Sequence, residues 1–206
     1  MQTVKHLLDY AATNPNAILT YQSSDMVVAG HSDASYLLET KSRSIAGENI
    51  FMSNNTAFPP NNVAVLTIAK IIKAVISSTA ETQLGAIFIN CKEAITELQA
   101  LEVMELTQTL TPMQTDNTIA HGVVTNNISR KQLKSMGMKL HWLRCRKPQG
   151  NFRNYWRSGP TNLGYYVTKH HAAIHYRTIS PHYLTPKRQL DLLRNRVTSR
   201  GSLPEE

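Results

Sequence analysis

Three acidic residues of this sequence, Asp33, Glu81 and Asp116, each stand next to an apolar segment. Carboxylate oxygens are the ligands that hard divalent cations such as Mg²⁺ prefer. Two such ions held about 4 Å apart can activate a water and stabilise the leaving oxygen when a phosphodiester is hydrolysed. The three acids could therefore form a metal site for this chemistry, provided that the fold brings them together.

Each acid also has an ordinary structural explanation. Asp33 follows His31 and Ser32, and Asp and Ser both favour turns. Glu81 completes the pattern Ser-Thr-Ala-Glu at 78–81, a capping box in which the glutamate binds the amide of the N-cap residue. Asp116 could equally be the N-cap of a following helix. Local sequence leaves both explanations open for each residue.

The first half of the chain predicts an antiparallel meander. The apolar run at 26–32 predicts a first strand, with Asp33 at its end. Residues 47–52 predict a second strand. Residues 63–76 are rich in β-branched side chains and favour one long or interrupted strand, although periodicity alone does not separate strand from helix there.

A long helix is predicted at 80–104, because apolar residues recur there at steps of three and four. Glu81 would lie in its first turn, on the buried side. A short strand at 111–116 would end at Asp116. If this strand lies beside the first one, the three carboxylates converge. The remaining elements are expected as helices at 1–13, 117–124, 130–147 and 163–171 and a strand at 152–156.

Charge is divided unevenly along the 206 residues. Residues 1–116 hold 6 Lys/Arg and 11 Asp/Glu, whereas residues 117–206 hold 16 Lys/Arg and 3 Asp/Glu. Between 117 and 190 there is no acidic residue against 13 Lys/Arg, and aromatic residues are interspersed. This pattern is typical of a polyanion partner such as nucleic acid. A basic surface without a ligand is the alternative.

Composition argues against a membrane protein. No apolar run approaches the roughly 20 residues that span a bilayer, and the N-terminus lacks the pattern of a secretory signal. Cys91 and Cys145 are far apart, without the spacing of a metal site. We therefore expect reduced thiols in an intracellular protein.

Several motifs together resemble the ribonuclease H domain of copia-type LTR retrotransposon polyproteins. They match that family in order and spacing over about 18–172. The acid order Asp–Glu–Asp is also that of ribonuclease H, whereas related integrases and transposases place their glutamate last. The motifs are His-Ser-Asp-Ala-Ser-Tyr at 31–36, Ser-Ser-Thr-Ala-Glu-Thr-Gln-Leu at 77–84, Gln-Thr-Asp-Asn at 114–117, Lys-Leu-His-Trp-Leu-Arg at 139–144, Thr-Asn-Leu at 161–163, and Thr168-Lys169.

The resemblance implies an α/β, ribonuclease H-like fold, with a five-stranded mixed sheet in the order 3-2-1-4-5 and helices on both faces. It implies hydrolysis of the RNA strand of RNA–DNA hybrids by two Mg²⁺ (or Mn²⁺) ions. Asp33 would bridge both ions, and Glu81 and Asp116 would ligate one of them. The reverse transcriptase portion of the same polyprotein would be a partner. The protein would reside in the cytoplasm, within a virus-like particle, or in the nucleus.

The sequence departs from the family at a fourth acid. The family pattern resembles Asn-Leu-Ala-Asp, whereas this chain reads Asn-Leu-Gly-Tyr at 162–165, so that Tyr165 replaces the aspartate. A phenol, with a reference pKa of about 10, is a poor Mg²⁺ ligand at neutral pH. The second metal loses a ligand, and the activity of this copy is expected to be impaired. The alternatives to an enzyme are a non-catalytic nucleic-acid-binding module and a decayed polyprotein relic.

The chain is predicted to divide into three regions: a leading helix and linker at 1–17, the ribonuclease H-like domain at 18–172, and a basic C-terminal arm at 173–206.

Basic and polar residues are expected to contact the hybrid. The predicted nucleic-acid contacts are Ser35, Asn117, His121, Lys131, Lys134, Lys139, Arg144 and Arg157.

Overall fold

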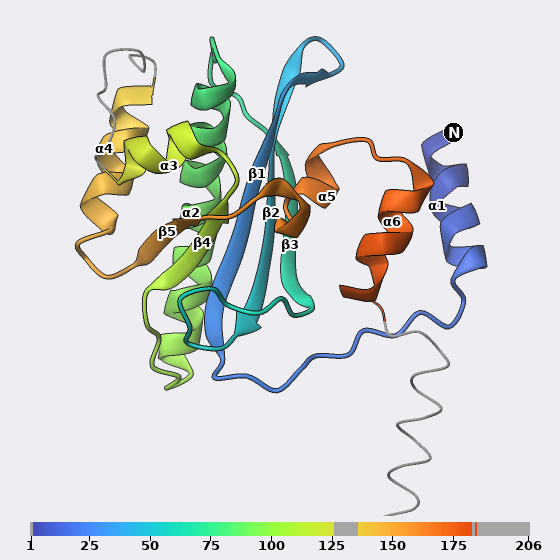
Figure 1. Cartoon of the computed structure of the whole chain (residues 1–206), viewed down its shortest axis with the longest axis horizontal. Helices are drawn as coiled ribbons and strands as arrows, with labels where there is room; N and C mark the ends of the chain where they lie inside the picture. Colours follow the sequence, from blue (N-terminus) through green and yellow to red (C-terminus); the bar gives the residue numbers. More distant parts are fainter. Residues whose placement is uncertain (1, 126–135, 183, 185–206) are drawn as a thin grey trace, which may run out of the picture.

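One five-stranded sheet organises the computed structural model, which describes residues 2–125, 136–182 and 184 (Figure 1). Its strand order is β3-β2-β1-β4-β5. The first three strands are antiparallel, and β4 and β5 run parallel to β1. The predicted mixed sheet of ribonuclease H-like order is therefore confirmed. The strands are β1 (Val27–Glu39), β2 (Arg43–Ser53), β3 (Ala64–Ile71), β4 (Thr111–Thr115) and β5 (Phe152–Trp156).

Strand β1 continues well past the point where the sequence predicted its end. Asp33 pairs with Gly47 of β2, and the ladder runs on through Ser35 before it shifts register toward Glu39. Asp33 is thus in the middle of a strand and fully buried. The prediction of a strand end at residue 32 is wrong, and so is the turn explanation of Asp33. Polar residues are accommodated in this strand because they find partners on the elements that cover it.

Helix α2 (Thr79–Val103) covers one face of the sheet, as predicted to within a residue at each end. Its buried stripe includes Leu84, Ile87, Cys91 and Leu98 and packs into the main core. Two further helices complete that layer, α3 (Thr118–Val124) and α4 (Gly137–Arg146). The part of the predicted helix at 130–147 that falls within 126–135 lies outside the described residues.

The opposite face of the sheet is covered by the segment after β5. It contains a 3₁₀ turn, η3 (Gly159–Thr161), and a one-turn helix, α5 (Tyr165–Thr168). The helix predicted at 163–171 is thus much shorter, because the backbone is extended at Lys169. Consecutive residues of β1 bond to the elements on opposite faces of the sheet: Ser32 accepts from Asn90 of α2, and Asp33 accepts from Thr168 of α5.

The remaining described elements lie beside this domain. Helix α1 (Gln2–Thr13) and helix α6 (Ala173–Ile179) lie to one side of the sheet in Figure 1, and the 3₁₀ turn η4 (Ser180–His182) follows α6. No helix among the described residues is long and apolar enough to cross a membrane. The region boundaries at 17 and 172 stay predictions.

Candidate active site

Asp33 and Asp116 come level with one another on two neighbouring parallel strands. Gly30 pairs with Met113, and His31 with Gln114. Two residues further along each chain bring Asp33 and Asp116 to the same height and the same face, because side chains alternate with a period of two. Asp33 is fully buried, whereas Asp116, one residue past the end of β4, is partly exposed. The sheet therefore brings two of the three predicted acids together.

The carboxyl group of Asp116 is not used as a helix cap. The N-cap of α3 is Asn117, whose Oδ1 accepts a hydrogen bond from the amide of Ala120 at 2.8 Å. The capping explanation of Asp116 is therefore wrong. Burial raises the pKa of Asp116, and the nearby charge of Asp33 raises it further, while Lys169 acts in the opposite direction. Asp116 thus lies within the electrostatic field of both residues.

Glu81 lies in the first turn of α2 and is buried. Ser78 is the N-cap, and its hydroxyl accepts from the amide of Glu81 at 3.2 Å, which is one half of the predicted capping box. The other half differs. Oε2 of Glu81 accepts from the amide of Ser77 at 2.8 Å and from its hydroxyl at 2.6 Å, one residue before the N-cap. Glu81 therefore orders the approach to α2, at the corner where Asp33 also lies.

Gln83 connects that first turn to the strand. Its Nε2 donates to Oδ1 of Asp33 at 3.1 Å and to the carbonyl of Ala34 at 3.3 Å. The turn that bears Glu81 is thus tied directly to Asp33. Strand β1, the start of α2 and the end of β4 meet here, and they bring Asp33 and Asp116 together while the carboxyl group of Glu81 is directed to Ser77.

The other oxygen of Asp33 is bound by α5 and the residue after it. Oδ2 accepts a hydrogen bond from the hydroxyl of Thr168, and it lies 3.3 Å from Nζ of Lys169. The same Nζ lies 3.5 Å from the ring centroid of Tyr165, a cation–π contact. A positively charged group is therefore already placed against the buried carboxylate.

This arrangement decides whether a metal ion fits. Three carboxylates are the right donor type for Mg²⁺ or Mn²⁺. However, both oxygens of Asp33 are occupied by protein groups, one of them cationic. Across the described ranges there is no group of three or more His, Cys, Asp and Glu residues placed to hold a metal ion. As they are placed here, these residues do not fit a divalent ion.

Two buried polar residues hold the covering segment on β1. Nδ1 of His31 accepts from the amide of Leu163 at 2.9 Å, and Nδ2 of Asn162 donates to the carbonyl of Ser32 at 2.8 Å. Burial, and secondarily the charge of Arg157, lowers the pKa of His31 to about 3, so that the ring is neutral. These bonds set the position of the chain that leads to Thr168 and Lys169.

Close approach of this segment requires small residues on the sheet. A Cβ on Gly47 would overlap Cγ2 of Thr168 and lie 2.9 Å from the carbonyl oxygen of Gly164. His31, Gln83 and Lys169 lie within the sequence motifs quoted above, but neither their contacts nor the close approach at Gly47 could be predicted from them. The available signal was the polar pair His31-Ser32 directly after an apolar strand, since buried polar groups need partners.

The residues predicted to contact nucleic acid fall into several environments. The guanidinium group of Arg144 donates to the carbonyl of Val123 at 2.6 and 3.2 Å, at the end of α3. Ser35 is buried in β1, and Asn117 caps α3. Nζ of Lys139 lies 3.7 Å from the sulfur of Met136. These positions leave the predicted contacts untested.

His121, Arg157 and two lysines complete the predicted set. His121 is partly exposed, and burial followed by the charge of Lys147 lowers its pKa. Arg157 follows β5, and its guanidinium carbon lies 5.9 Å from the ring centroid of Phe58. Lys131 and Lys134 lie outside the described residues.

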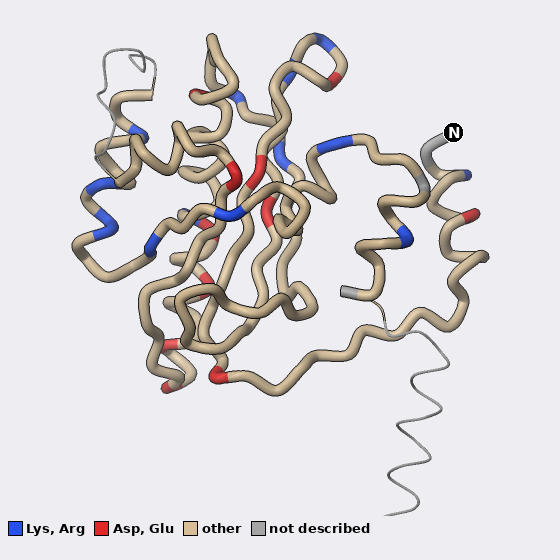
Figure 2. The backbone as a smooth tube through the Cα atoms, viewed as in Figure 1, with Lys and Arg blue, Asp and Glu red and all other residues tan. Residues whose placement is uncertain are grey.

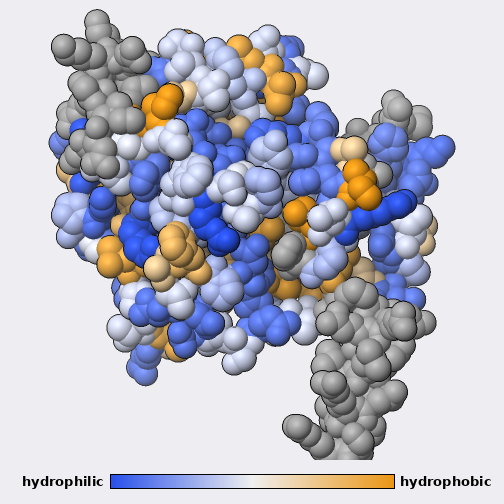
Figure 3. Space-filling view, viewed as in Figure 1, coloured by the Kyte–Doolittle hydropathy of each residue, from blue (hydrophilic) through white to orange (hydrophobic). Residues whose placement is uncertain are grey.

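The distribution of charge follows the fold. Figure 2 shows Lys and Arg on α4 and along the segment after β5, and Asp and Glu on β1, β2 and α2. The face in Figure 3 is mostly hydrophilic over the middle of the domain. The site around Asp33 and Asp116 thus lies next to the segment after β5, which carries basic residues.

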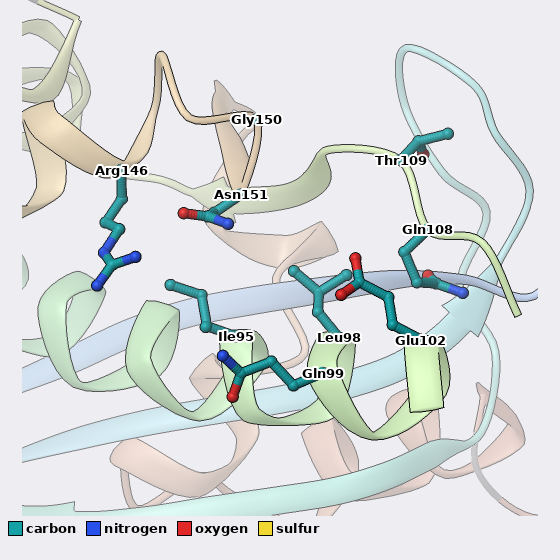
Figure 4. A pocket seen from close by; sticks show the side chains of 9 residues that line it. All are labelled: Ile95, Leu98, Gln99, Glu102, Gln108, Thr109, Arg146, Gly150 and Asn151. Carbon is teal, nitrogen blue, oxygen red and sulfur yellow. The ribbon is translucent and has the colours of Figure 1, made fainter. Parts of the chain in front are cut away.

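A pocket on the same side of the sheet as α2 is separate from this corner (Figure 4). Ile95, Leu98 and Glu102 of α2 line it, together with Arg146 and Asn151. Ile95 is 14 residues beyond Glu81, or about 21 Å along the helix axis at about 1.5 Å per residue. The pocket holds none of the three predicted acids.

Comparisons with known proteins give structural similarities only. No family model matches the sequence, and no curated protein matches it. Similar solved structures include the N-terminal RNase H domain of a Mycobacterium tuberculosis protein fused to maltose binding protein (10% identity, TM-score 0.45, 66% of this chain and 86% of that chain). LC11-RNase H1 in complex with an RNA/DNA hybrid is also similar (10%, 0.46, 66% and 88%), as is RNase H1 from Halobacterium salinarum (11%, 0.39, 68% and 89%).

Proposed function

We propose that this chain is a ribonuclease H-type domain that acts on RNA–DNA hybrids and hydrolyses the RNA strand, with Asp33, Glu81 and Asp116 as its acidic site residues. The observation that carries the proposal is the parallel register of β1 and β4, which sets Asp33 level with Asp116. Gln83 then ties the first turn of α2, with Glu81, to Asp33. Ribonuclease H-like order of the sheet and of the acids supports the same assignment.

The three acids have different capacities. Asp33 is enclosed and ion-paired, and Glu81 is buried against Ser77. Asp116 is the partly exposed one, and its pKa is raised. Asp116 is therefore the carboxyl group of the three that is in contact with solvent at the site. Nucleic-acid backbone contacts are proposed for Arg157, Lys139 and His121. The resemblance noted in the sequence favours a copia-type retrotransposon origin for the chain.

A second function follows from the ion pair between Lys169 and Asp33. A site whose central carboxylate is neutralised by lysine, and whose fourth position is Tyr165, suits a hybrid-binding module without turnover. Binding would then depend on salt, because each phosphate contacted by Lys or Arg releases counterions.

The test is cleavage of an RNA–DNA hybrid in Mg²⁺ and in Mn²⁺ by the full chain and its variants. We expect cleavage by the chain or by Tyr165→Asp, and at least a 100-fold loss in either background when Asp33→Asn is added. Glu48→Gln is the matched control, since it also replaces a buried carboxyl group but on the other face of the sheet. Hybrid binding without cleavage by any variant would support the second function. Cleavage that survives Asp33→Asn would overturn the assignment.

A further inference from the structure

We propose that Lys169 is an internal counter-cation of the candidate active site, which occupies the place beside Asp33 that a divalent ion would need and so suppresses metal binding. The inference rests on the proposed function only in taking Asp33, Glu81 and Asp116 as the acids of the site. It assigns Lys169 as the residue that regulates access of Mg²⁺ or Mn²⁺ to them.

The first step is the position of the ammonium group. Nζ of Lys169 lies 3.3 Å from Oδ2 of Asp33, within ion-pair distance. The side chain of Asp33 is fully buried, whereas that of Lys169 is 27% exposed. Lys169 therefore stands on the solvent side of Asp33. A cation arriving from solvent meets the ammonium group before it reaches Oδ2.

The second step is that Lys169 is held on two sides. Its Nζ lies 3.5 Å from the ring centroid of Tyr165, which provides an attractive face for a cation. The adjacent Thr168 donates its hydroxyl to the same Oδ2. The backbone leaves α5 at Lys169, so that two consecutive residues turn toward one carboxylate. Tyr165 thus supports the lysine in its place beside Asp33.

The third step is the reach of the ammonium charge. Asp116 lies level with Asp33 on the neighbouring parallel strand, within range of the ammonium charge beside Asp33. Its field therefore acts on both aspartates of the parallel pair. A divalent ion at this corner would be repelled by Lys169 as long as the ammonium group stays in place.

The experiment measures Mn²⁺ binding to the full chain by the electron paramagnetic resonance signal of free Mn²⁺. We expect Lys169→Gln to bind Mn²⁺ at least tenfold more tightly than the unmodified chain. Lys169→Arg keeps the charge and should bind like the unmodified chain. Lys92→Gln is the matched control, because it removes an exposed lysine from α2, and it should change nothing. Adding Asp33→Asn to Lys169→Gln should remove the gain.

Three results would overturn the inference. One is a Lys169→Gln variant that binds Mn²⁺ no more tightly than Lys92→Gln. Another is an unmodified chain that already binds Mn²⁺ as tightly as Lys169→Gln. The third concerns a Lys169→Gln variant that circular dichroism shows to be unfolded without metal. Millimolar Mn²⁺ should restore the folded spectrum by replacing the missing charge, and a spectrum that stays unfolded would overturn the inference.

Hybrid cleavage separates this inference from the proposed function. A gain in Mn²⁺ affinity without cleavage by any variant would leave the counter-cation in place and remove the nuclease assignment. Cleavage by the unmodified chain, combined with equal Mn²⁺ affinity in Lys169→Gln, would leave the nuclease assignment and remove the counter-cation.

Discussion

Asp33 and Glu48 are completely buried carboxyl groups on neighbouring strands, one residue out of step and on opposite faces of the sheet. Asp33 has Gln83 on one oxygen and Thr168 and Lys169 on the other. Neither oxygen of Glu48 has a hydrogen-bond partner among the described residues. Burial raises the pKa of Glu48 well above its ordinary value, with further increases from Glu93 and Glu97. Asp33 therefore has hydrogen-bond donors and a cation beside it, whereas Glu48 has neither, and burial favours its neutral form.

The difference follows from what covers each face. The face of Asp33 is covered by a short segment whose polar side chains bond to β1, and this segment approaches closely because Gly47 has no Cβ in the way. The face of Glu48 is covered by α2, whose buried stripe is mainly apolar and includes Cys91, and whose buried Asn90 donates to Ser32 and to the carbonyl of Gly47 and not to Glu48. An ionised carboxylate without a partner is strongly disfavoured there. Charge survives burial only where the covering element brings a donor or a cation.

Removing the cation from Asp33 is expected to have the largest effect. Lys169→Met leaves the Asp33 carboxylate buried without its ion pair, and we expect the free energy of unfolding at pH 7 to fall by about 2–3 kcal/mol, discounted because Lys169 is partly exposed. Asp33→Asn should cost about 1–2 kcal/mol, because the remaining ammonium group can turn to solvent. Urea unfolding in EDTA measures both. Equal losses of stability in Lys169→Met and Asp33→Asn would contradict a buried ion pair between Asp33 and Lys169.

Detaching the covering segment should have the next largest effect. His31→Leu removes the acceptor of the Leu163 amide and leaves a buried N–H group without it, so we expect a loss of about 2 kcal/mol. The loss should be accompanied by faster hydrogen exchange at 162–168. His141→Leu, on α4, serves as the control for replacing a histidine. Unchanged exchange at 162–168 would mean that His31 does not hold the segment.

Neutralising Glu48 should stabilise the protein, in contrast to the two changes above. A raised pKa in the folded state means that the unfolded chain releases this proton first, so stability falls as pH rises above about 4.5. Glu48→Gln removes this loss, and we expect a gain of about 1–2 kcal/mol at pH 8 and little change at pH 4. Unfolding at both pH values measures it. An equal effect at the two pH values would show that Glu48 ionises normally.

The smallest effect is expected at Asp116, the partly exposed acid. Asp116→Asn removes the unfavourable interaction with Asp33, and we expect the free energy of unfolding to change by less than about 1 kcal/mol at neutral pH. Urea unfolding measures the change, and it should be a gain. A loss of more than about 1 kcal/mol in the free energy of unfolding would mean that the side chain of Asp116 stabilises the fold.

Much of the architecture could be read from the sequence. Apolar periodicity located α2, with its buried stripe, to within a residue at each end, and turn residues bounded β4 and β5. The sheet order was also predicted, from the family resemblance. The predicted end of β1 failed because polar residues were taken as a boundary. In a strand covered on both faces, such residues are interior whenever a distant segment supplies their partners.

What the sequence by itself determined is which residue types are available: acids at positions 33, 81 and 116, an acid-free stretch in the basic half, and tyrosine at position 165. Only the tertiary structure decided how they are used. Asn117, and not Asp116, caps α3, and Glu81 accepts from Ser77, one residue before the N-cap Ser78. The carboxylate of Asp33 is paired with Lys169, which is 136 residues further along the chain. Ion pairs and buried hydrogen bonds depend on distances of a few ångströms between segments that no local pattern relates. For that reason a sequence can indicate candidate site residues, while tertiary packing determines which charged groups lie beside them.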